Sequence, residues 1–479
     1  MKPVAKLIIF ITTLPVIALT IYLIKSNLQS TPNINEISSP TLIGQSMIPF
    51  WQGDTIYNES MLLVSYNNGQ PESPFLFPYV NIISVQNSAL NLTYTPGTDW
   101  MFKDNKLILP TGSRIPFVLA SEIDSPNFST PLDYFHSKQV SVTYTHTGKW
   151  LGPIPRYSPD LLPETIQKLD SGSPLKITLY GDSISVGYNT SGLLNIPPYL
   201  PSWGDLVVKA LSSKYTSPIA YSNPSVAGKD TAWGRASVDT LVSANTPDLV
   251  ILAFGMNDGA IKIPTEVYKA NISSMINDIK STSPKVEIIL VSPMLGFPGS
   301  NFTGFQSSYS QALQSLVKTG VAYVDMAAVH LELLKVKKYA DLTGNNINHP
   351  NDFLSRWYAQ ETVGLLIAPT VAELNMKPVK GTTDKNTIYL VENGIKRSYP
   401  NEALFLASFT HSQVIQLSDV TLARIPSGKD VGDNSPSAKP GDLNGDGKVN
   451  LYDYTELIRG YTTLYADDDF INVLSNYGK

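Results

Sequence analysis

The 479-residue chain has no cysteine, few charged residues and only five histidines. Without cysteine there can be no disulfide, no thiolate metal site and no cysteine nucleophile. The net charge of -5 and the lack of a long basic run argue against a nucleic-acid partner. Hydrophobic residues make up 42% and charged residues 16%, which is typical of a globular protein. A chain this long is expected to form about two to four domains.

A long apolar run from Leu7 to Ile24 stands at the N-terminus between lysines. As a helix it would span roughly 27 Å, close to the thickness of a bilayer core. A cleaved signal peptide would have a shorter apolar core and a cleavage site such as Ala-x-Ala, and no such site follows Lys25. We therefore expect a signal anchor over residues 1–25 and a linker over 26–43. The bulk of the chain would then lie outside the cytoplasm, at the cell surface or, if the segment is cleaved, secreted.

Two regions have the patterns of β structure. Between residues 44 and 157, short alternating stretches separated by Gly, Pro, Asn and Asp turns predict a β-sandwich. Its role would be to pack against the next domain or to bind glycan. A smaller module is expected over 386–426, because Asn393-Gly394 separates two strand-like runs and indicates a type I′ hairpin. This module resembles short repeats of bacterial surface proteins and suggests a spacer or wall-binding unit, followed by a linker over 427–439.

Between residues 163 and 374, apolar strands alternate with amphipathic helices. Ile272, Met275 and Ile279, for example, share one face of the helix expected over 265–280. This alternation predicts three layers, a parallel sheet with helices on both faces. In such sheets functional residues gather at the carboxyl ends of the strands. The expected strands are 176–180, 218–221, 248–253, 286–291 and 321–324.

Four motifs follow strands of this sheet. Ser183, in Gly-Asp-Ser, follows the first strand, where a strand-to-helix turn would expose its hydroxyl. Gly228 and Asn257 follow the next two strands and could offer a backbone and a side-chain N–H to an oxyanion. His349 lies in an Asn- and Pro-rich loop after the last strand, and the other four histidines lie elsewhere. Taken singly, each motif has a structural alternative: a turn or helix cap for the serine, a turn for the glycine, a helix cap for the asparagine and a structural role for the histidine. Their position at the same edge of the sheet and their order along the chain point to acyl transfer.

The motifs and their order over residues 175–366 resemble the SGNH/GDSL hydrolase family. The resemblance implies a flavodoxin-like α/β domain with Ser183 as nucleophile and His349 as its base. It also implies an oxyanion hole made by the N–H groups of Ser183 and Gly228 and the side chain of Asn257, with no cofactor in catalysis. A β-domain before such a domain resembles bacterial carbohydrate esterases, which implies O-acetyl groups on polysaccharide, or small esters, as substrates. The alternatives are a lipase or thioesterase of the same fold and an inactive surface glycan-binding protein.

The sequence departs from the family at one position. The family usually has aspartate three residues before the histidine, where this chain has Asn346. An amide can orient the imidazole but cannot stabilise the imidazolium charge as a carboxylate does. Asp341 or Asp352 would fill the role from a nearby position. Otherwise a backbone carbonyl holds His349, as in Ser–His dyads, or the activity is modest.

Near the C-terminus, oxygen donors occupy positions 1, 3, 5, 9 and 12 of a loop with glycine at position 6. This spacing predicts an EF-hand-like site for structural Ca²⁺. The expected ligands are Asp442, Asn444, Asp446, Lys448 through its carbonyl, Asn450 and Asp453. Residues 440–479 resemble one half of a dockerin type I domain, which implies a cohesin partner. The second half, however, lacks a full loop, so a single calcium-stabilised helical hairpin is the simpler expectation.

Overall fold

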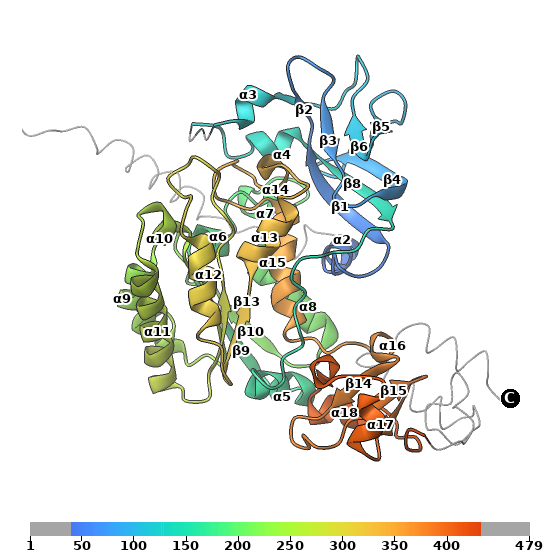
Figure 1. The fold of residues 1–479 in the computed structure, drawn as a ribbon. Helices are drawn as coiled ribbons and strands as arrows, with labels where there is room; N and C mark the ends of the chain where they lie inside the picture. Colours follow the sequence, from blue (N-terminus) through green and yellow to red (C-terminus); the bar gives the residue numbers. More distant parts are fainter. Residues whose placement is uncertain (1–39, 126, 128, 433–479) are drawn as a thin grey trace, which may run out of the picture.

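The computed structural model describes residues 40–432 apart from 126 and 128. The predicted anchor and the predicted calcium loop lie outside this range, so both stay predictions. Among the helices that are described, none combines the length and the hydrophobicity needed to cross a bilayer. The described chain has an α/β centre, a β-rich part at one end and a small C-terminal module at the other (Figure 1).

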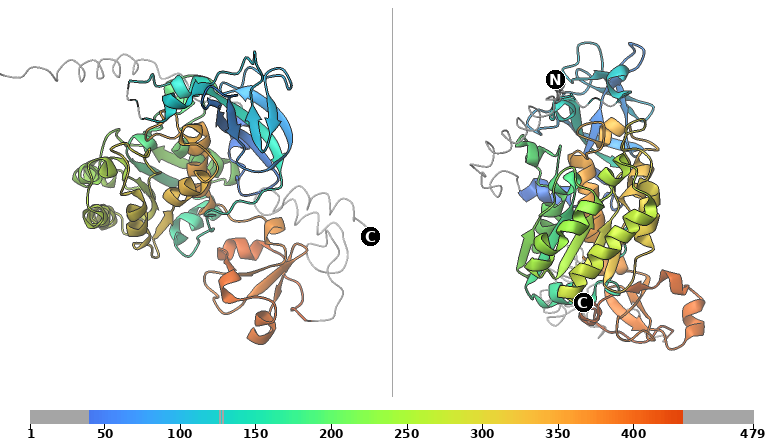
Figure 2. Two further views of the ribbon diagram at one scale, coloured as in Figure 1. Left: turned by 45° about the horizontal axis from the view of Figure 1, so that its top comes forward. Right: turned by 90° about the vertical axis from the view of Figure 1, so that its left-hand side faces the viewer.

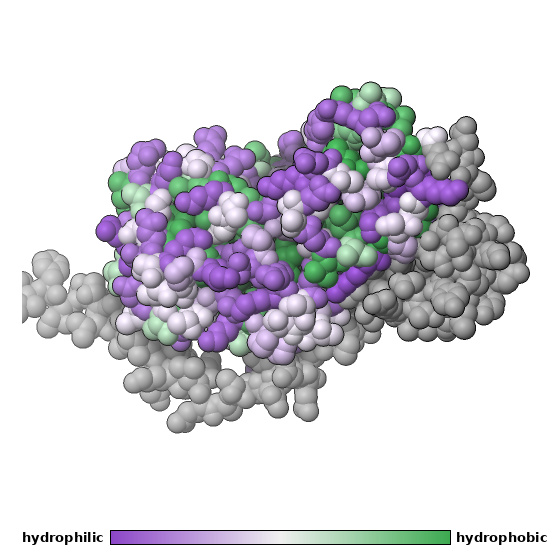
Figure 3. Space-filling view, turned by 90° about the horizontal axis from the view of Figure 1, so that it is seen from below, coloured by the Kyte–Doolittle hydropathy of each residue, from purple (hydrophilic) through white to green (hydrophobic). Residues whose placement is uncertain are grey.

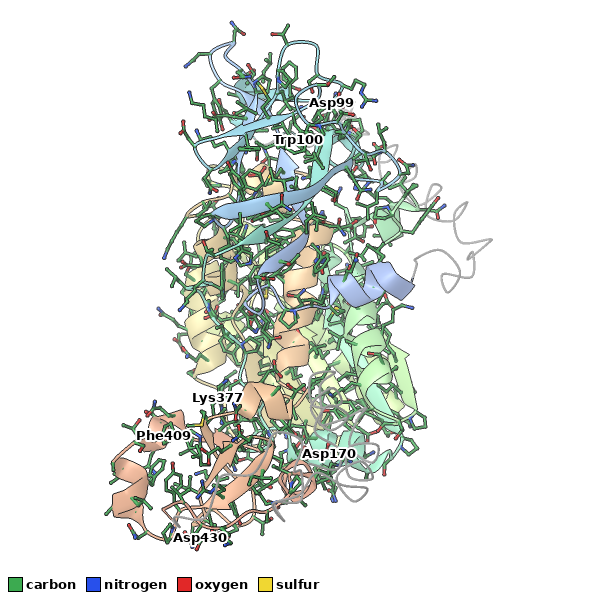
Figure 4. All side chains as sticks on the ribbon, turned by 90° about the vertical axis from the view of Figure 1, so that its right-hand side faces the viewer. Asp99, Trp100, Asp170, Lys377, Phe409 and Asp430 are labelled. Atoms are coloured by element: carbon green, nitrogen blue, oxygen red, sulfur yellow. The ribbon has the colours of Figure 1, made fainter. Side chains whose placement is uncertain are left out.

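Further views show the same arrangement. In the right-hand view of Figure 2 the central α/β layers lie between the N-terminal part, at the top, and the C-terminal module, at the bottom. In Figure 4, Asp99 and Trp100 mark the N-terminal end, whereas Phe409 and Asp430 mark the module at the opposite end. The face seen in Figure 3 is largely hydrophilic, with apolar residues in separate patches.

The centre is a five-stranded parallel sheet, as predicted, with the strand order β10-β9-β11-β12-β13. In chain order this is 2-1-3-4-5, the flavodoxin-like order, whose switch point lies between the first and third strands. The predicted strand positions are correct to within one or two residues. The strands are β9 (Leu175–Gly181), β10 (Ile219–Ser222), β11 (Leu249–Ala253), β12 (Glu287–Val291) and β13 (Val321–Val324).

Alternate side chains of the strands pack on opposite faces, because successive residues of a strand point to opposite sides. Ile251 packs in the core on the side of α8 and α15, whereas Val250 and Leu252 pack in a second core with α9, α11 and α12. The helices are α8 (Trp203–Lys214), α9 (Thr231–Leu241), α11 (Thr265–Thr282), α12 (Gln306–Gln314) and α15 (Asp352–Gly364). The sheet is therefore buried on both faces, which leaves its carboxyl edge to carry the site.

The N-terminal part contains two sheets, in agreement with the β pattern of residues 44–157; the sandwich arrangement itself stays a prediction. One sheet is antiparallel, in the order β1-β8-β4, and the other has the order β5-β6-β3-β2-β7. Two short helices, α3 (Ala120–Ile123) and α4 (Tyr134–Lys138), precede β8. The strands are β1 (Thr55–Leu62), β2 (Val64–Ser65), β3 (Glu72–Pro74), β4 (Tyr79–Asn87), β5 (Met101–Lys103), β6 (Lys106–Ile108), β7 (Val118–Leu119) and β8 (Gln139–His146).

Buried polar contacts join the N-terminal sheets to the segment that leads into the His349 loop. Glu59 of β1 forms an ion pair with Lys337 at 2.5 Å, and both side chains are completely buried. Gln139 of β8 donates to the carbonyls of Ala340 and Thr343 at 2.7 and 2.9 Å. A buried polar group that loses its hydrogen-bond partner lowers the stability of the folded state. The N-terminal and central parts therefore depend on each other for stability.

The C-terminal module has a four-stranded sheet in the order β16-β15-β14-β17. Its hairpin turn has positive φ at Asn393 (52°) and Gly394 (84°), which confirms the predicted type I′ conformation. β14 begins before the predicted boundary at residue 386. Ser418 of the module donates to Asp170 of the central part at 2.5 Å, so the module contacts the end of the sheet remote from the site. The strands are β14 (Lys377–Lys380), β15 (Tyr389–Glu392), β16 (Ile395–Ser398) and β17 (Ile415–Gln416).

Candidate active site

Ser183 lies where β9 turns into the short helix α6 (Ser183–Val186). A side chain at Gly181 would place its Cβ 2.3 Å from the carbonyl oxygen of Ala253 on β11, so this close turn requires glycine. The Asp182 carboxylate accepts a hydrogen bond from Ile184 N–H at 3.0 Å and caps the helix. Since α6 begins at Ser183, the helical hydrogen-bond pattern leaves the N–H of this residue unused.

The loop between α14 (Tyr339–Leu342) and α15 brings His349 to Ser183. Its backbone folds back on itself, because Gly344 N–H donates to the His349 carbonyl at 3.1 Å. The Asn345 Oδ1 accepts the N–H of His349, also at 3.1 Å. His349 Nε2 then lies 2.9 Å from Ser183 Oγ. The structure thus brings together Ser183 and His349, as the sequence predicted. The serine is only 4% exposed.

Besides the Ser183 N–H, the other two predicted oxyanion donors follow the ends of the neighbouring strands. The loop after β10 docks on β9 through Val226 N–H, which donates to the Gly181 carbonyl at 3.1 Å. Gly228, at the end of this loop, has φ of 76°, and the space where a Cβ would stand is open. Asn257 donates one amide hydrogen to the Lys229 carbonyl at 3.0 Å, which leaves its second amide hydrogen for another acceptor. Both donors therefore follow the strands that flank β9 in the sheet.

Neither predicted acid forms a hydrogen bond or an ion pair with His349. Asp341 is fully buried and accepts hydrogen bonds from Leu62 N–H at 2.7 Å and Lys338 N–H at 2.8 Å. Asp352 accepts Ser191 N–H at 2.8 Å. The prediction that either carboxylate orients His349 is therefore wrong. Each carboxylate instead accepts hydrogen bonds from backbone N–H groups of other residues.

His349 Nδ1 lies 2.8 Å from Oδ1 of Asn189, nearer than its second neighbour, Asn345 Nδ2, at 3.1 Å. Sequence reasoning missed Asn189, because an asparagine in a turn after a short helix carries no signal of function. Asn346, at the family's usual aspartate position, turns away and donates to the carbonyl of Ile123 at 3.0 Å. Its φ of 54° is a conformation that asparagine adopts more readily than most residues.

Burial sets the electrostatics of the site. It lowers the pKa of His349 from 6.5 to about 4, because an imidazolium is poorly stabilised away from water. Burial also raises the pKa of Asp182 to about 7 and that of Asp258 to about 6. Neutral His349 is the form that can accept a proton from Ser183. Within the described part of the chain, no group of three or more His, Asp or Glu side chains could hold a metal ion.

Aromatic residues near the motifs differ in burial. Trp203 is completely buried and belongs to the core. Trp233 is partly buried, with the Lys229 ammonium 5.6 Å from its ring centroid. Tyr188 is half-buried, and its ring centroid lies 5.5 Å from that of His349. Of the three, Tyr188 therefore borders the reacting groups.

Residues 179–354, which carry all four motifs, match the model of the GDSL-like Lipase/Acylhydrolase family. The match therefore covers the part of the chain that holds the site.

Among curated proteins, the chain is 33% identical over 116 residues to an arylesterase of Vibrio mimicus, covering 24% of this chain and 54% of the relative. It is 28% identical over 130 residues to the isoamyl acetate-hydrolyzing esterase 1 homolog of Homo sapiens, covering 25% and 47%. The chain spans about half the length of these relatives.

Two solved structures are also similar. An acetylxylan esterase from Geobacillus stearothermophilus has 21% identity and a TM-score of 0.33, and the match covers 41% of this chain and 96% of that one. A two-domain esterase active on acetylated mannans has 18% identity and a TM-score of 0.37, with coverage of 50% and 65%.

Proposed function

We propose that the protein hydrolyses carboxylic esters through Ser183 and His349. His349 Nε2 accepts the Ser183 hydroxyl proton while Oγ attacks the ester carbonyl carbon. The resulting oxyanion is stabilised by the N–H groups of Ser183 and Gly228 and by the Asn257 amide. The C–O bond to the alcohol breaks as His349 returns its proton to the leaving oxygen. Water, deprotonated by His349, then attacks the acyl-enzyme, and the acid leaves as Ser183 recovers its proton.

The observation that carries this proposal is the 2.9 Å contact between Ser183 Oγ and His349 Nε2. This contact lies at the carboxyl edge of a flavodoxin-like sheet, where such folds bind their ligands. Gly228 and Asn257 follow the strands on either side of β9, as donors for the same oxyanion would. The names of the curated relatives, both esterases, support the same reaction class.

For the substrate, we propose acetyl esters of carbohydrate. A relative named for the hydrolysis of isoamyl acetate supports an acetyl group on the acid side. The half-buried Tyr188 next to His349 offers an aromatic face for a sugar ring on the alcohol side.

We also propose that the protein works outside the cell, anchored by residues 1–25, and that its C-terminal segment holds one structural Ca²⁺. The apolar run 7–24 and the oxygen-donor loop 442–453 support these two statements. A cohesin would be the partner of this segment if the half-dockerin suffices for docking. The anchor, and a cohesin bound to the C-terminal segment, would keep the enzyme close to polysaccharide at the cell surface.

The test is acetate release from acetylated xylan and mannan oligosaccharides by the full chain and by Ser183→Ala. Ser212→Ala, on an exposed turn of α8, is the matched control and should retain wild-type rates. We expect Ser183→Ala to lose acetate release by a factor of 10³ or more, on the order of the loss when a catalytic serine is removed. Equal rates for wild type and Ser183→Ala would favour an inactive binding protein. A preference for long-chain p-nitrophenyl esters over acetylated sugars would favour the lipase alternative.

A further inference from the structure

The Nδ1 atom of His349 has two amide neighbours with opposite requirements. Asn189 Oδ1 lies 2.8 Å away and can only accept a hydrogen bond, so it requires a proton on Nδ1. Asn345 Nδ2 lies 3.1 Å away and can only donate, so it requires a lone pair on Nδ1. Only the first arrangement leaves Nε2 free to accept the Ser183 proton. The choice between the two tautomers therefore decides whether the pair is competent.

Neighbouring groups fix the orientation of each amide. Asn189 Nδ2 donates to the carbonyl of Leu132 at 2.8 Å, so its oxygen must face His349. Asn345 Oδ1 accepts the backbone N–H groups of Ile347, Asn348 and His349 at 3.0 to 3.1 Å, so its nitrogen must face the ring. Neither side chain can rotate by half a turn to suit the other without breaking these bonds.

The contacts favour the proton on Nδ1. Asn345 Nδ2 also donates to Asn348 Oδ1 at 2.9 Å, so it keeps a partner in either tautomer. Asn189 is 2% exposed, and His349 is the one partner that its Oδ1 has among the described residues. In the other tautomer, two lone pairs would face each other at 2.8 Å and a buried carbonyl would be left unsatisfied, which is the more expensive arrangement.

We propose that Asn189 is the positioning residue of this site, and that it holds His349 in the tautomer whose Nε2 accepts the Ser183 proton. This inference rests on the proposed function and deepens it. The N-terminal β-rich part takes a share in the site, because the Leu132 carbonyl that fixes Asn189 belongs to the segment between α3 and α4. Gly344 provides the space, since a Cβ there would lie 2.6 Å from that of Asn189.

The amide also explains how the site differs from one with a carboxylate. A neutral oxygen orients the ring without adding negative charge, so nothing opposes the burial that holds the pKa of His349 near 4. A carboxylate at the same distance would favour the imidazolium and raise this pKa by about 1–3 units. Substitution of Asn189 by aspartate therefore has a signature in pH that loss of packing would not produce.

The experiment compares Asn189→Ala and Asn189→Asp with the wild type in ester hydrolysis over pH 3.5–8. Asn189→Ala should lower kcat by up to about 10⁴-fold, the loss seen when a triad histidine takes the wrong tautomer, with little change in KM. Asn189→Asp should move the acid limb of kcat/KM up by at least about one pH unit. Asn195→Asp is the matched control, because Asn195 is also left-handed (φ 55°) but exposed; it should change neither quantity.

A second readout does not need activity. With ¹⁵N-labelled histidine, the full chain gives ring signals from only five residues, and His349→Gln identifies those of His349. We expect the proton on Nδ1 in the wild type at pH 7 and a shift toward Nε2 in Asn189→Ala. A proton on Nε2 in the wild type, or an Asn189→Ala enzyme with kcat within about threefold of wild type, would overturn the inference. Absence of ester hydrolysis by the wild type would instead refute the proposed function, while the ring signals would still test Asn189.

Discussion

Removal of the Lys337 ammonium should destabilise the whole molecule and not only the N-terminal part. The partner of Lys337, Glu59, lies 2.5 Å away, and both side chains are 0% exposed. Glu59 also accepts Tyr144 O–H at 2.5 Å and Leu76 N–H at 3.0 Å. In Lys337→Met these two donors remain, but the carboxylate charge stays buried without its cation. Breaking a buried pair in this way costs about 3–5 kcal/mol of unfolding free energy.

The double variant Glu59→Gln/Lys337→Met provides the control. Glutamine keeps an oxygen for Tyr144 and Leu76 but carries no charge, so the double variant should be more stable than Lys337→Met by about 2 kcal/mol or more. Urea unfolding of the four proteins of this cycle, followed by far-ultraviolet circular dichroism, measures the coupling. Additive losses, with the double variant less stable than either single variant, would refute the view that a buried charge pair joins the two parts.

Four further predictions concern the site and the metal. The acid limb of kcat/KM should lie near pH 4, because the pKa of His349 is lowered to about 4; a limb near pH 6.5 would contradict this. In the unfolded chain the His349 imidazole has its ordinary pKa of 6.5 and binds a proton more tightly than in the folded state. The folded state should therefore lose stability as the pH falls from about 6.5 to 4. In urea unfolding, His349→Gln should weaken this dependence of stability on pH. Asn257→Ala should lower kcat about 10²- to 10³-fold, the value of one oxyanion donor; a normal kcat in p-nitrophenyl acetate hydrolysis would exclude that role. The full chain should bind one Ca²⁺ in calorimetry and lose it in Asp446→Ala, whereas retained binding would place the ion elsewhere.

The sequence was sufficient to predict the central sheet and the meeting of Ser183 with His349. Buried parallel strands are apolar throughout, so their positions are visible as short runs between amphipathic helices. Their carboxyl ends meet at one edge of the sheet, so residues that follow different strands are brought together by the topology alone. Gly228 and Asn257 were found by the same argument.

Contacts that depend on the path of loops could not be predicted in this way. Asp341 and Asp352 lie within eight residues of His349 in sequence, yet each binds backbone N–H groups of other segments. Asn189 lies far from His349 in the chain, and only the folded loops bring the two within 2.8 Å. The strand β14 was missed for a local reason, since its Lys-Pro-Val-Lys sequence lacks the apolar alternation that predicts a strand.

The most direct measurement is covalent labelling of the full chain by a fluorophosphonate, with the modified residue mapped by mass spectrometry. A serine activated by a neutral imidazole should form one adduct, on Ser183, and His349→Gln should abolish it. Ser185→Ala, two residues along the same short helix, should be labelled like the wild type. An adduct on another residue, or equal labelling of His349→Gln and wild type, would contradict the assignment of Ser183 as the nucleophile and His349 as its base.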